Sequence, residues 1–417
     1  MDLKKVIFDF KDFYALYKKG TPDGYQFFTS KKDFNKIRQE SSKVVGYLVK
    51  EFELRKNAEQ MKKASTAKTG DLNMSKIFSY QFNEDIFKKI SITPNGKSHG
   101  LVMILDWSGS MGNHIANTMK QLFNLVLFCK KVNIPYEVYA FSADGPVEYM
   151  FAIEPKSGDL AMSNFTMMNI LSSRMNATEF MYAGAVLCAL SHIGRTEGET
   201  TCYWTSLSST PLNQAIIAAM KIVPEFQKKN KLQIVNTVFL TDGESDTVNG
   251  IYYEERSNYS DKSRIVDRTL YGYDTLVVRD PKTKHQETVK DCRYGNNVTS
   301  GLVNLLKTVT NCNVVGFYIL AGNEFSRKII KFNKNLTSQQ FDRLTVEFRK
   351  NNYSVVTSAG FDEYYLLRSQ GMDIDDDAEF EVKENATTRG LVSAFTKYTG
   401  NKLNNRVVLN RFIKLIA

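Results

Sequence analysis

The chain has few of the residues that build disulfide frameworks, zinc sites or flexible proline-rich regions. Its 417 residues include only 5 Cys, 4 His and 8 Pro. The cysteines are odd in number and none of them forms a C-x-x-C pair, a pattern typical of reduced, buried thiols. They are Cys129, Cys188, Cys202, Cys292 and Cys312. We therefore expect neither a disulfide framework nor a zinc site.

Long apolar runs are also missing. The longest one lies near Leu101–Leu105, far short of the ~20 residues that cross a bilayer. The first residues, Met1–Lys5, lack the apolar stretch of a secretory signal. We therefore expect a cytoplasmic protein that has no membrane contact.

The composition is that of an ordered globular protein whose charge is unevenly spread. Hydrophobic residues make up 42% and charged residues 24% of the chain, and the net charge is +10. Residues 1–100 hold 20 Lys and Arg against 12 Asp and Glu, so they carry most of the excess. A basic region attracts nucleic acid or acidic proteins. It is also compatible with an ordinary solvated surface, and both interpretations stay open.

Apolar spacing divides the chain into two regions. Residues 1–97 read as a basic, mainly helical segment, because apolar side chains recur every three or four positions between 34 and 54. A polar turn is expected at 68–73. Residues 98–417 alternate apolar strands with helices, as in a parallel sheet covered on both faces. We therefore predict an α/β fold with a doubly wound, mostly parallel sheet of the Rossmann-like type.

Individual elements can be placed within the second region. The expected strands are Leu101–Leu105, Tyr136–Phe141, Ile234–Leu240, Val314–Leu320 and Tyr353–Thr357, with Tyr149–Ile153 as an antiparallel edge. The expected helices are Ile115–Lys131, Pro211–Lys228, Ser300–Thr310 and Ser326–Phe332. Two stretches, near 154–205 and 250–298, are longer than ordinary connections and are expected to be insertions. The second should contain a β-hairpin whose turn includes Pro281.

Candidate metal ligands follow the first of these strands. Asp106, Ser108 and Ser110 form a D-x-S-x-S run between the strand and a helix. Ligand sites in open α/β sheets form at the carboxyl ends of strands. Mg²⁺ prefers oxygen ligands and keeps several of its waters, which suits two hydroxyls together with a carboxylate. Gly109 is expected to allow the tight turn between them.

Two further motifs have the same setting. Thr210 precedes Pro211, which opens a predicted helix. Asp242 and Gly243 end the strand that begins near Ile234. The three motifs together resemble those of the von Willebrand factor type A domain, whose metal-ion-dependent adhesion site they form.

The resemblance implies a role for each ligand. Ser108, Ser110 and Thr210 would bind the metal directly, and Asp106 and Asp242 would do so directly or through water. The cation would be Mg²⁺, with Mn²⁺ or Ca²⁺ as alternatives. One coordination position would remain for an acidic residue of a protein partner.

Four residues are candidates for the rim or the second layer of the site: Trp107, Gly109, His114 and Gly243. Trp107 could pack against the domain or act as an exposed binding anchor. His114 could support the metal ligands or simply begin the next helix.

A wider resemblance suggests the cellular setting. The segment Lys68–Leu72, Trp107 within the metal motif and the helical basic lead-in are similar to the cobalt chelatase large non-ATPase subunit and to related phage-encoded proteins. In that group the domain works beside a MoxR-type AAA+ ATPase, so the resemblance implies such a partner. It favours an adaptor with no catalytic activity of its own. The alternatives are a subunit of an ATP-dependent cobalt chelatase, and a phage-related assembly or nucleic-acid-associated factor.

Aromatic residues among the lysines of the first 32 positions bear on the last alternative. Tyr14, Tyr17, Phe27 and Phe28 show a mixture found in single-strand nucleic-acid binders. Their spacing matches no recognised module, so core packing is the favoured interpretation.

Overall fold

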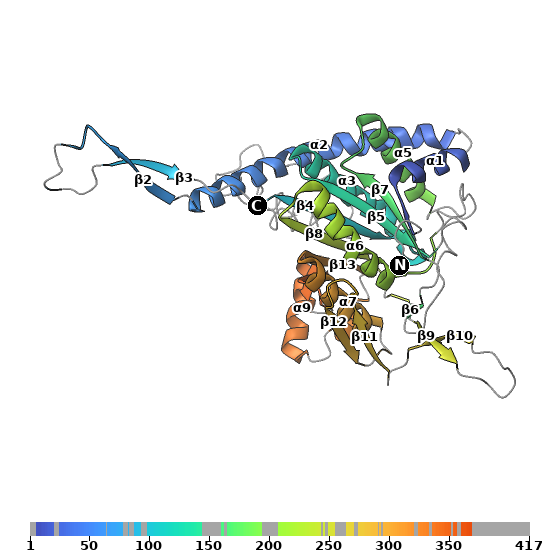
Figure 1. The fold of residues 1–417 in the computed structure, drawn as a ribbon. Coiled ribbons are helices and arrows are strands. Elements are labelled where there is room, and N and C mark those ends of the chain that lie inside the picture. Colours follow the sequence, from blue (N-terminus) through green and yellow to red (C-terminus); the bar gives the residue numbers. More distant parts are fainter. Residues whose placement is uncertain are drawn as a thin grey trace.

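The structure is a computed structural model of the full chain. It describes residues 6–20, 25–63, 65–77, 82, 87–92, 98–143, 160–161, 165–193, 207–242, 245–246, 249–254, 264–270, 274–290, 292, 295–320, 324–332, 336–351, 353–356 and 360–368. Within these residues a central, mostly parallel sheet is flanked by helices on both faces (Figure 1). The predicted α/β fold class is therefore confirmed.

The central sheet has eight strands among the described residues. In spatial order they are β1 (Ile7–Phe8), β7 (Thr166–Ser172), β5 (Tyr136–Ser142), β4 (His99–Asp106), β8 (Ile234–Thr241), β13 (Asn313–Leu320), β15 (Glu363–Arg368) and β14 (Tyr353–Val356). The run from β5 through β4, β8 and β13 to β15 is parallel. Its carboxyl ends therefore share one edge of the sheet, where the candidate metal motifs lie.

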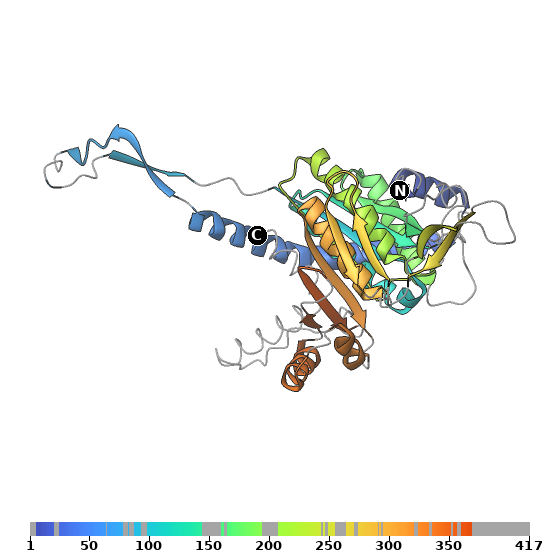
Figure 2. The same ribbon diagram turned by 60° about the horizontal axis from the view of Figure 1, so that its bottom comes forward.

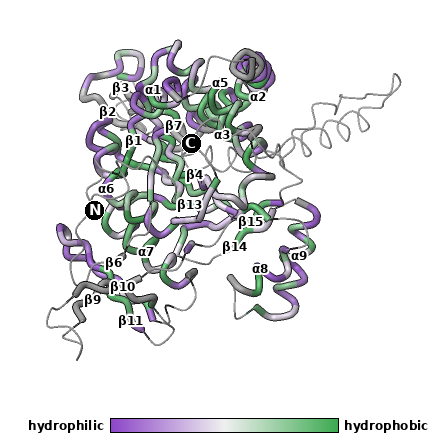
Figure 3. Tube along the Cα trace, turned by 90° about the vertical axis from the view of Figure 1, so that its right-hand side faces the viewer, coloured by the Kyte–Doolittle hydropathy of each residue, from purple (hydrophilic) through white to green (hydrophobic). Residues whose placement is uncertain are grey.

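Each face of the sheet is covered by its own group of helices. One face carries α1 (Phe10–Gly20), α2 (Tyr25–Lys63), α3 (Ile115–Lys131) and α5 (Ala177–Ile193), and the other carries α6 (Leu212–Asn230), α7 (Gly295–Thr310), α8 (Phe325–Phe332) and α9 (Ser338–Asn351). Figure 3 shows hydrophobic segments along the central strands and along helices such as α6 and α7. Burial on both faces explains why β4 reads as a continuous apolar run and not as an alternating one.

The N-terminal segment shares a core with the sheet. Strand β1 pairs in parallel with β7, and the Tyr14 hydroxyl donates a 2.6 Å hydrogen bond to the carbonyl of Ile170. The Phe34 ring lies against Gly184 of α5, where an added Cβ would come within 2.2 Å of it. Tyr14 and Tyr17 are buried, so their expected core role is confirmed. The structure does not describe the side chains of residues 27 and 28.

The stretch 154–205 is more than an insertion. It supplies β7, which lies between the edge strand β1 and β5 and pairs antiparallel with β5, and α5, which packs on one face. The stretch that we expected to be an insertion therefore contributes a strand and a helix to the central layers. The antiparallel neighbour of β5 is β7, and the edge predicted at 149–153 lies outside the described residues.

The far side of the sheet also differs from expectation. The strand predicted at 353–357 is present as β14, but it forms an antiparallel edge. The parallel neighbour of β13 is β15, which sequence reasoning missed. A hairpin such as β14–β15 can reverse within a few residues, whereas a parallel pair needs a long crossover.

Three smaller sheets complete the described fold. The predicted hairpin is confirmed as β11 (Thr275–Arg279) paired with β12 (Gln286–Lys290). A three-stranded sheet contains β6 (Leu160–Ala161), β9 (Asn249–Glu254) and β10 (Arg264–Thr269). The third is β2 (Ser65–Leu72) paired with β3 (Phe87–Ile92). The predicted turn at 68–73 is therefore wrong over most of its length.

Two remaining expectations concern cysteines and membranes. Cys129, Cys188, Cys292 and Cys312 are free and buried, as predicted, whereas residue 202 lies outside the described part of the chain. Among the described helices none combines the length and apolar character that a membrane crossing requires.

Candidate metal centre

Asp106 is the last residue of β4 and is fully buried. The Thr241 hydroxyl, from the neighbouring strand β8, donates a 2.5 Å hydrogen bond to its Oδ2 atom. Its Oδ1 atom is buried and has no hydrogen-bond partner among the described residues. Burial, reinforced by the negative charges of Asp242 and Asp246, raises the pKa of Asp106 to about 7. Hydrogen bonding from Thr241 and Ser108 opposes that rise, and the Oδ1 atom remains without a hydrogen-bond partner of its own among the described residues.

The two serines of the first motif lie together beside Asp242. The Ser108 and Ser110 hydroxyl oxygens are 3.1 Å apart, and the Ser110 hydroxyl donates a 2.6 Å hydrogen bond to Oδ1 of Asp242. Burial raises the pKa of Asp242, while the Ser110 hydrogen bond and the nearby His114 oppose that rise. Motifs 132 positions apart in sequence thus meet at one point.

Thr210 belongs to a loop that lies between the loop after β4 and the loop after β8. Ser208 forms an isolated parallel bridge with Ser108, and its carbonyl accepts a 2.8 Å hydrogen bond from the Gly109 amide. The carbonyl of Thr210 accepts a 3.0 Å hydrogen bond from the Asp246 amide, in the loop after β8. The segment 207–211 is therefore tied by its backbone to both of the other loops, and Thr210 is buried within it.

The turn after Ser108 is a short 3-10 helix, η3 (Gly109–Asn113), followed by α3. A Cβ at Gly109 would come no closer than 3.8 Å to Ser208, which is an ordinary contact. Gly109 also has no positive φ. The expectation that this turn requires glycine is therefore not supported by its geometry.

The other candidate rim residues differ in their surroundings. Trp107 is 2% exposed and joins the core beneath the site, so it packs and the exposed-anchor alternative is wrong. His114 connects η3 to α3 and acts electrostatically on Asp242, so it both begins a helix and lies near the site. Residue 243 lies outside the described residues.

Two polar residues of the site were missed by sequence reasoning. Thr241 directly precedes Asp242 and donates to Asp106, and Asp246 acts electrostatically on Asp106 from the same loop. Burial raises the pKa of Asp246 as well. Both residues lie within five positions of Asp242. This closeness in sequence to a predicted ligand was the only indication that they could belong to the site. Their orientation toward Asp106 depends on tertiary structure.

The chemistry of these residues fits a small hard cation. The described residues contain no group of three or more His, Cys, Asp or Glu side chains that could by itself hold a metal ion. This site instead combines carboxylates with hydroxyls, the oxygen-rich set that Mg²⁺ accepts while it retains waters. A buried carboxylate oxygen without a partner is costly unless a cation or donor meets it. Asp106, Ser108, Ser110 and Asp242 could hold such an ion, with Thr210 beside them.

Comparisons with known proteins give no family for the chain. No protein-family model and no curated protein matches it. Among solved structures, the pilus adhesin SpaC from Lactobacillus rhamnosus GG in its open conformation is 14% identical with a TM-score of 0.32; the match covers 75% of this chain and 30% of SpaC. A second SpaC structure is 14% identical with a TM-score of 0.31, covering 60% of this chain and 27% of that one. The type V pili tip protein Mfa5 from Porphyromonas gingivalis is 9% identical with a TM-score of 0.26, covering 61% of this chain and 48% of that one. The chain thus spans less than half of each of these proteins, and such low scores identify no relative.

Proposed function

We propose that this chain is a Mg²⁺-dependent adaptor that captures an acidic residue of a protein partner at the carboxyl edge of its central sheet. The observation that carries the proposal is the meeting of three loops at Asp106. These loops come from separate parts of the sequence, and they bring hydroxyls and carboxylates together around a carboxylate oxygen that lacks a partner among the described residues.

The residues would divide the work of holding the cation. Ser108, Ser110 and Thr210 would offer neutral oxygens, and Asp106 and Asp242 would offer charge directly or through water. When bound, a divalent cation would supply a Lewis-acidic position that an incoming Glu or Asp can complete. Because few anionic ligands are present, the site would keep its attraction for a further carboxylate.

Several contacts would hold these oxygens in place before a partner arrives. Thr241 fixes the rotamer of Asp106, and the backbone bonds from Gly109 to Ser208 and from Asp246 to Thr210 fix the loops. Such prior ordering reduces the entropy that is lost on binding. The rigid sheet, and not the partner, would therefore shape the site.

The resemblance to the cobalt chelatase subunit suggests the kind of partner. We propose a MoxR-type AAA+ ATPase as the partner. This partner would hydrolyse ATP, because we see no nucleotide-binding motif in the present sequence. The chain would then act as the recognition subunit of a two-component machine.

The proposal is tested with purified full-length chain and a MoxR-type ATPase from the same source. Co-elution is measured in Mg²⁺ and again in EDTA. We expect a complex in Mg²⁺ that is lost in EDTA and lost again for Asp106→Asn. Equal binding in both buffers would overturn the adaptor mechanism.

A matched variant controls for the loss of charge. Asp342 is exposed on α9, away from the site, so Asp342→Asn removes one carboxylate without touching the three loops. This variant should bind as the wild type does. A parallel Mn²⁺ titration of both variants reports on the metal site without any partner.

A further inference from the structure

The end of α2 and the hairpin that follows it form an arm that leaves the body of the protein. We define the arm as residues 53–63 of α2, the strands β2 and β3, and the described residues between those strands, 73–77 and 82. Figures 1 and 2 show this hairpin projecting beyond the sheet and its helices. Strands β2 and β3 form a separate two-stranded sheet. The arm therefore does not extend the central sheet, and we looked for a role in binding.

Burial along α2 marks where the arm begins. Phe34, Val45, Leu48 and Phe52 are buried against the sheet's helical layer. Beyond Phe52, every residue of α2 whose side chain is described is exposed. From Glu53 onward α2 runs for 11 residues, roughly 16 Å, before the hairpin begins. The eight residues of β2 extend the reach by about 26 Å more.

Large apolar side chains are unusually exposed on this arm. Leu54 is 71%, Met74 is 68% and Phe82 is 91% exposed. They are half of the large hydrophobic residues that are exposed in the described part of the chain. Phe82 lies between the two strands in sequence, at the distal end of the hairpin. Met74 and Phe82 both follow β2 in sequence, so two large apolar side chains are presented beyond that strand, and Leu54 is exposed at the start of the arm.

Lysines gather at the base of the same hairpin. The stretches 62–68 and 88–92 contain five lysines and no acidic residue; we call them the lysine cluster, namely Lys62, Lys63, Lys68, Lys88 and Lys89. Lys68 and Lys89 hold directly opposite positions in the ladder. Like charges opposite each other weaken a two-stranded ribbon. A bound polyanion would favour two lysine positions paired in this way.

We propose that the arm binds double-stranded DNA. β-Ribbons bind DNA in either the major or the minor groove, and lysines supply the phosphate contacts that dominate affinity. An apolar side chain at the tip of such an element can wedge against base pairs. An acidic protein surface would account for the lysine cluster alone, whereas a duplex accounts for the ribbon, the lysines and the exposed Phe82 together.

The structure also changes where the basic N-terminal region can act. Phe13, Tyr14 and Tyr17 are buried beside the sheet, so they are not available to stack on bases. Deleting the whole segment 1–95 would therefore remove part of the core along with any binding surface. The arm carries exposed residues of that segment that lie beyond the last buried residue of α2, so it can be altered without disturbing the core.

The test measures binding of a fluorescent 20-base-pair DNA duplex to the full-length chain over a series of salt concentrations. The key variant is Lys68→Gln/Lys88→Gln/Lys89→Gln. We expect roughly tenfold weaker binding at low salt, and a salt slope that falls by about 0.9 for each phosphate that the variant no longer neutralises. Phe82→Ala should weaken binding severalfold and leave the salt slope unchanged.

The hairpin β11–β12 supplies a matched control. Lys282, Lys284 and Lys290 are exposed on this hairpin, so Lys282→Gln/Lys284→Gln/Lys290→Gln makes the same change in charge on the same kind of element. This variant should keep wild-type affinity and slope. Equal losses of affinity from the two triple variants would show a general charge effect and overturn the assignment. Circular dichroism confirms that both variants stay folded.

Competitors distinguish the class of ligand. We expect unlabelled duplex DNA to displace the probe better than single-stranded DNA, duplex RNA or polyglutamate of equal charge. Polyglutamate competing as well as the duplex would point to an acidic protein and overturn the proposal, as would a preference for either RNA or single strands. Binding should persist in EDTA and in Asp106→Asn, so failure of the arm proposal is distinguishable from failure of the adaptor proposal.

Discussion

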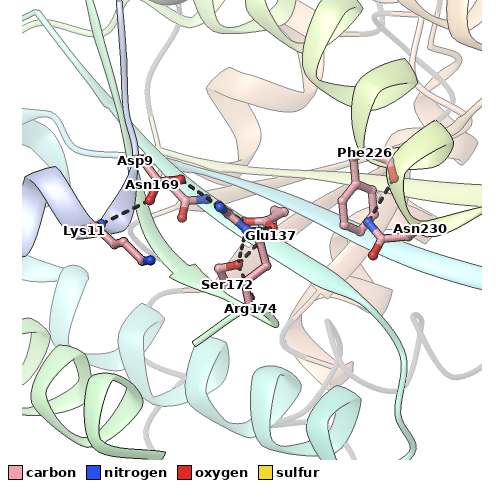
Figure 4. Close-up of polar contacts among 8 residues, drawn as sticks. All are labelled: Asp9, Lys11, Glu137, Asn169, Ser172, Arg174, Phe226 and Asn230. Atoms are coloured by element: carbon pink, nitrogen blue, oxygen red, sulfur yellow. Dashed lines mark hydrogen bonds and ion pairs between the residues drawn. The ribbon is translucent and has the colours of Figure 1, made fainter. Parts of the chain in front are cut away.

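The two ends of the central sheet each bury a carboxylate, and they surround it differently. At the carboxyl edge, Asp106 accepts hydrogen bonding from the hydroxyls of Thr241 and Ser108, and its Oδ1 has no hydrogen-bond partner among the described residues. At the opposite edge, Glu137 near the start of β5 accepts from Asn169 at 2.8 Å, from Ser172 at 2.9 Å and from Arg174 at 3.0 Å (Figure 4). Arg174 also forms a 2.9 Å ion pair with Asp9.

The difference separates a structural carboxylate from one suited to a ligand. Glu137 has its own cation and its own donors, and these tie β5, β7 and the end of β1 together. Asp106 is surrounded by hydroxyls and by further carboxylates, a set that becomes favourable once a cation is added. Burial alone therefore does not distinguish a carboxylate suited to a ligand from a structural one. The groups that surround each carboxylate make the difference.

The largest expected effect is the loss of metal binding in Asp106→Asn. The amide keeps the shape and can still accept from Thr241, but it removes the charge that a dication requires. We expect saturable Mn²⁺ binding, measured by calorimetry, to disappear while the melting temperature stays the same or rises. Unchanged Mn²⁺ affinity would place the metal elsewhere.

The reciprocal variant is Glu137→Gln. It removes the charge that Arg174 and two neutral donors contact, and a hydrogen bond to a charged group contributes about 1.5 to 3 kcal/mol; Arg174 is part-exposed and keeps Asp9, so we expect a loss near the lower value. Urea denaturation should show a lower free energy of unfolding, while Mn²⁺ affinity stays unchanged. If Glu137→Gln altered metal binding more than stability, the contrast between the two ends of the sheet would be lost.

A third effect concerns pH. The pKa of Asp106 is raised from 3.8 to about 7, so the folded state holds a proton that the unfolded state has released. Through this group, the free energy of unfolding of the metal-free protein should therefore fall as pH rises from about 4 to about 7. Asp106→Asn should flatten that slope, and a metal-free wild type and variant with parallel pH profiles would contradict it.

The smallest effect is expected from Thr241→Val. Losing the hydroxyl frees the rotamer of Asp106, and residues that orient a metal ligand typically contribute about 10- to 100-fold in affinity. We expect about tenfold weaker Mn²⁺ binding. Thr237→Val is the control, because Thr237 is buried on the same strand but contacts Cys312. Equal losses of affinity in both variants would assign the effect to packing.

Much of the fold could be read from local pattern. The helix predicted at Ile115–Lys131 has those bounds in the structure, and four of the five predicted strands lie in the parallel run. These elements have long apolar runs or clear helical periodicity, so neighbouring residues specify them. Strand β15 was missed, and β14 was assigned the wrong direction, because pairing partners depend on residues distant in sequence.

The residues of the candidate site could be predicted from the sequence, but their surroundings could not. The carboxyl ends of parallel strands share one edge of the sheet, whatever conformation the loops adopt. Ser110 and Asp242 therefore lie together, as expected. The orientation of Thr241 and Asp246 toward Asp106 follows from strand register and loop contacts. Trp107 had two open interpretations, and only its burial, with 2% of the residue exposed, decided between them.

The sequence by itself determined the class of fold and the oxygen-bearing residues at the carboxyl edge, because both follow from periodicity and from position at strand ends. The tertiary structure alone decided which segments share the core. It placed β7 and α5 in the central layers, buried Phe13, Tyr14 and Tyr17, and left the end of α2 with the hairpin β2–β3 projecting. Burial depends on contacts across the whole chain, and no local pattern records it.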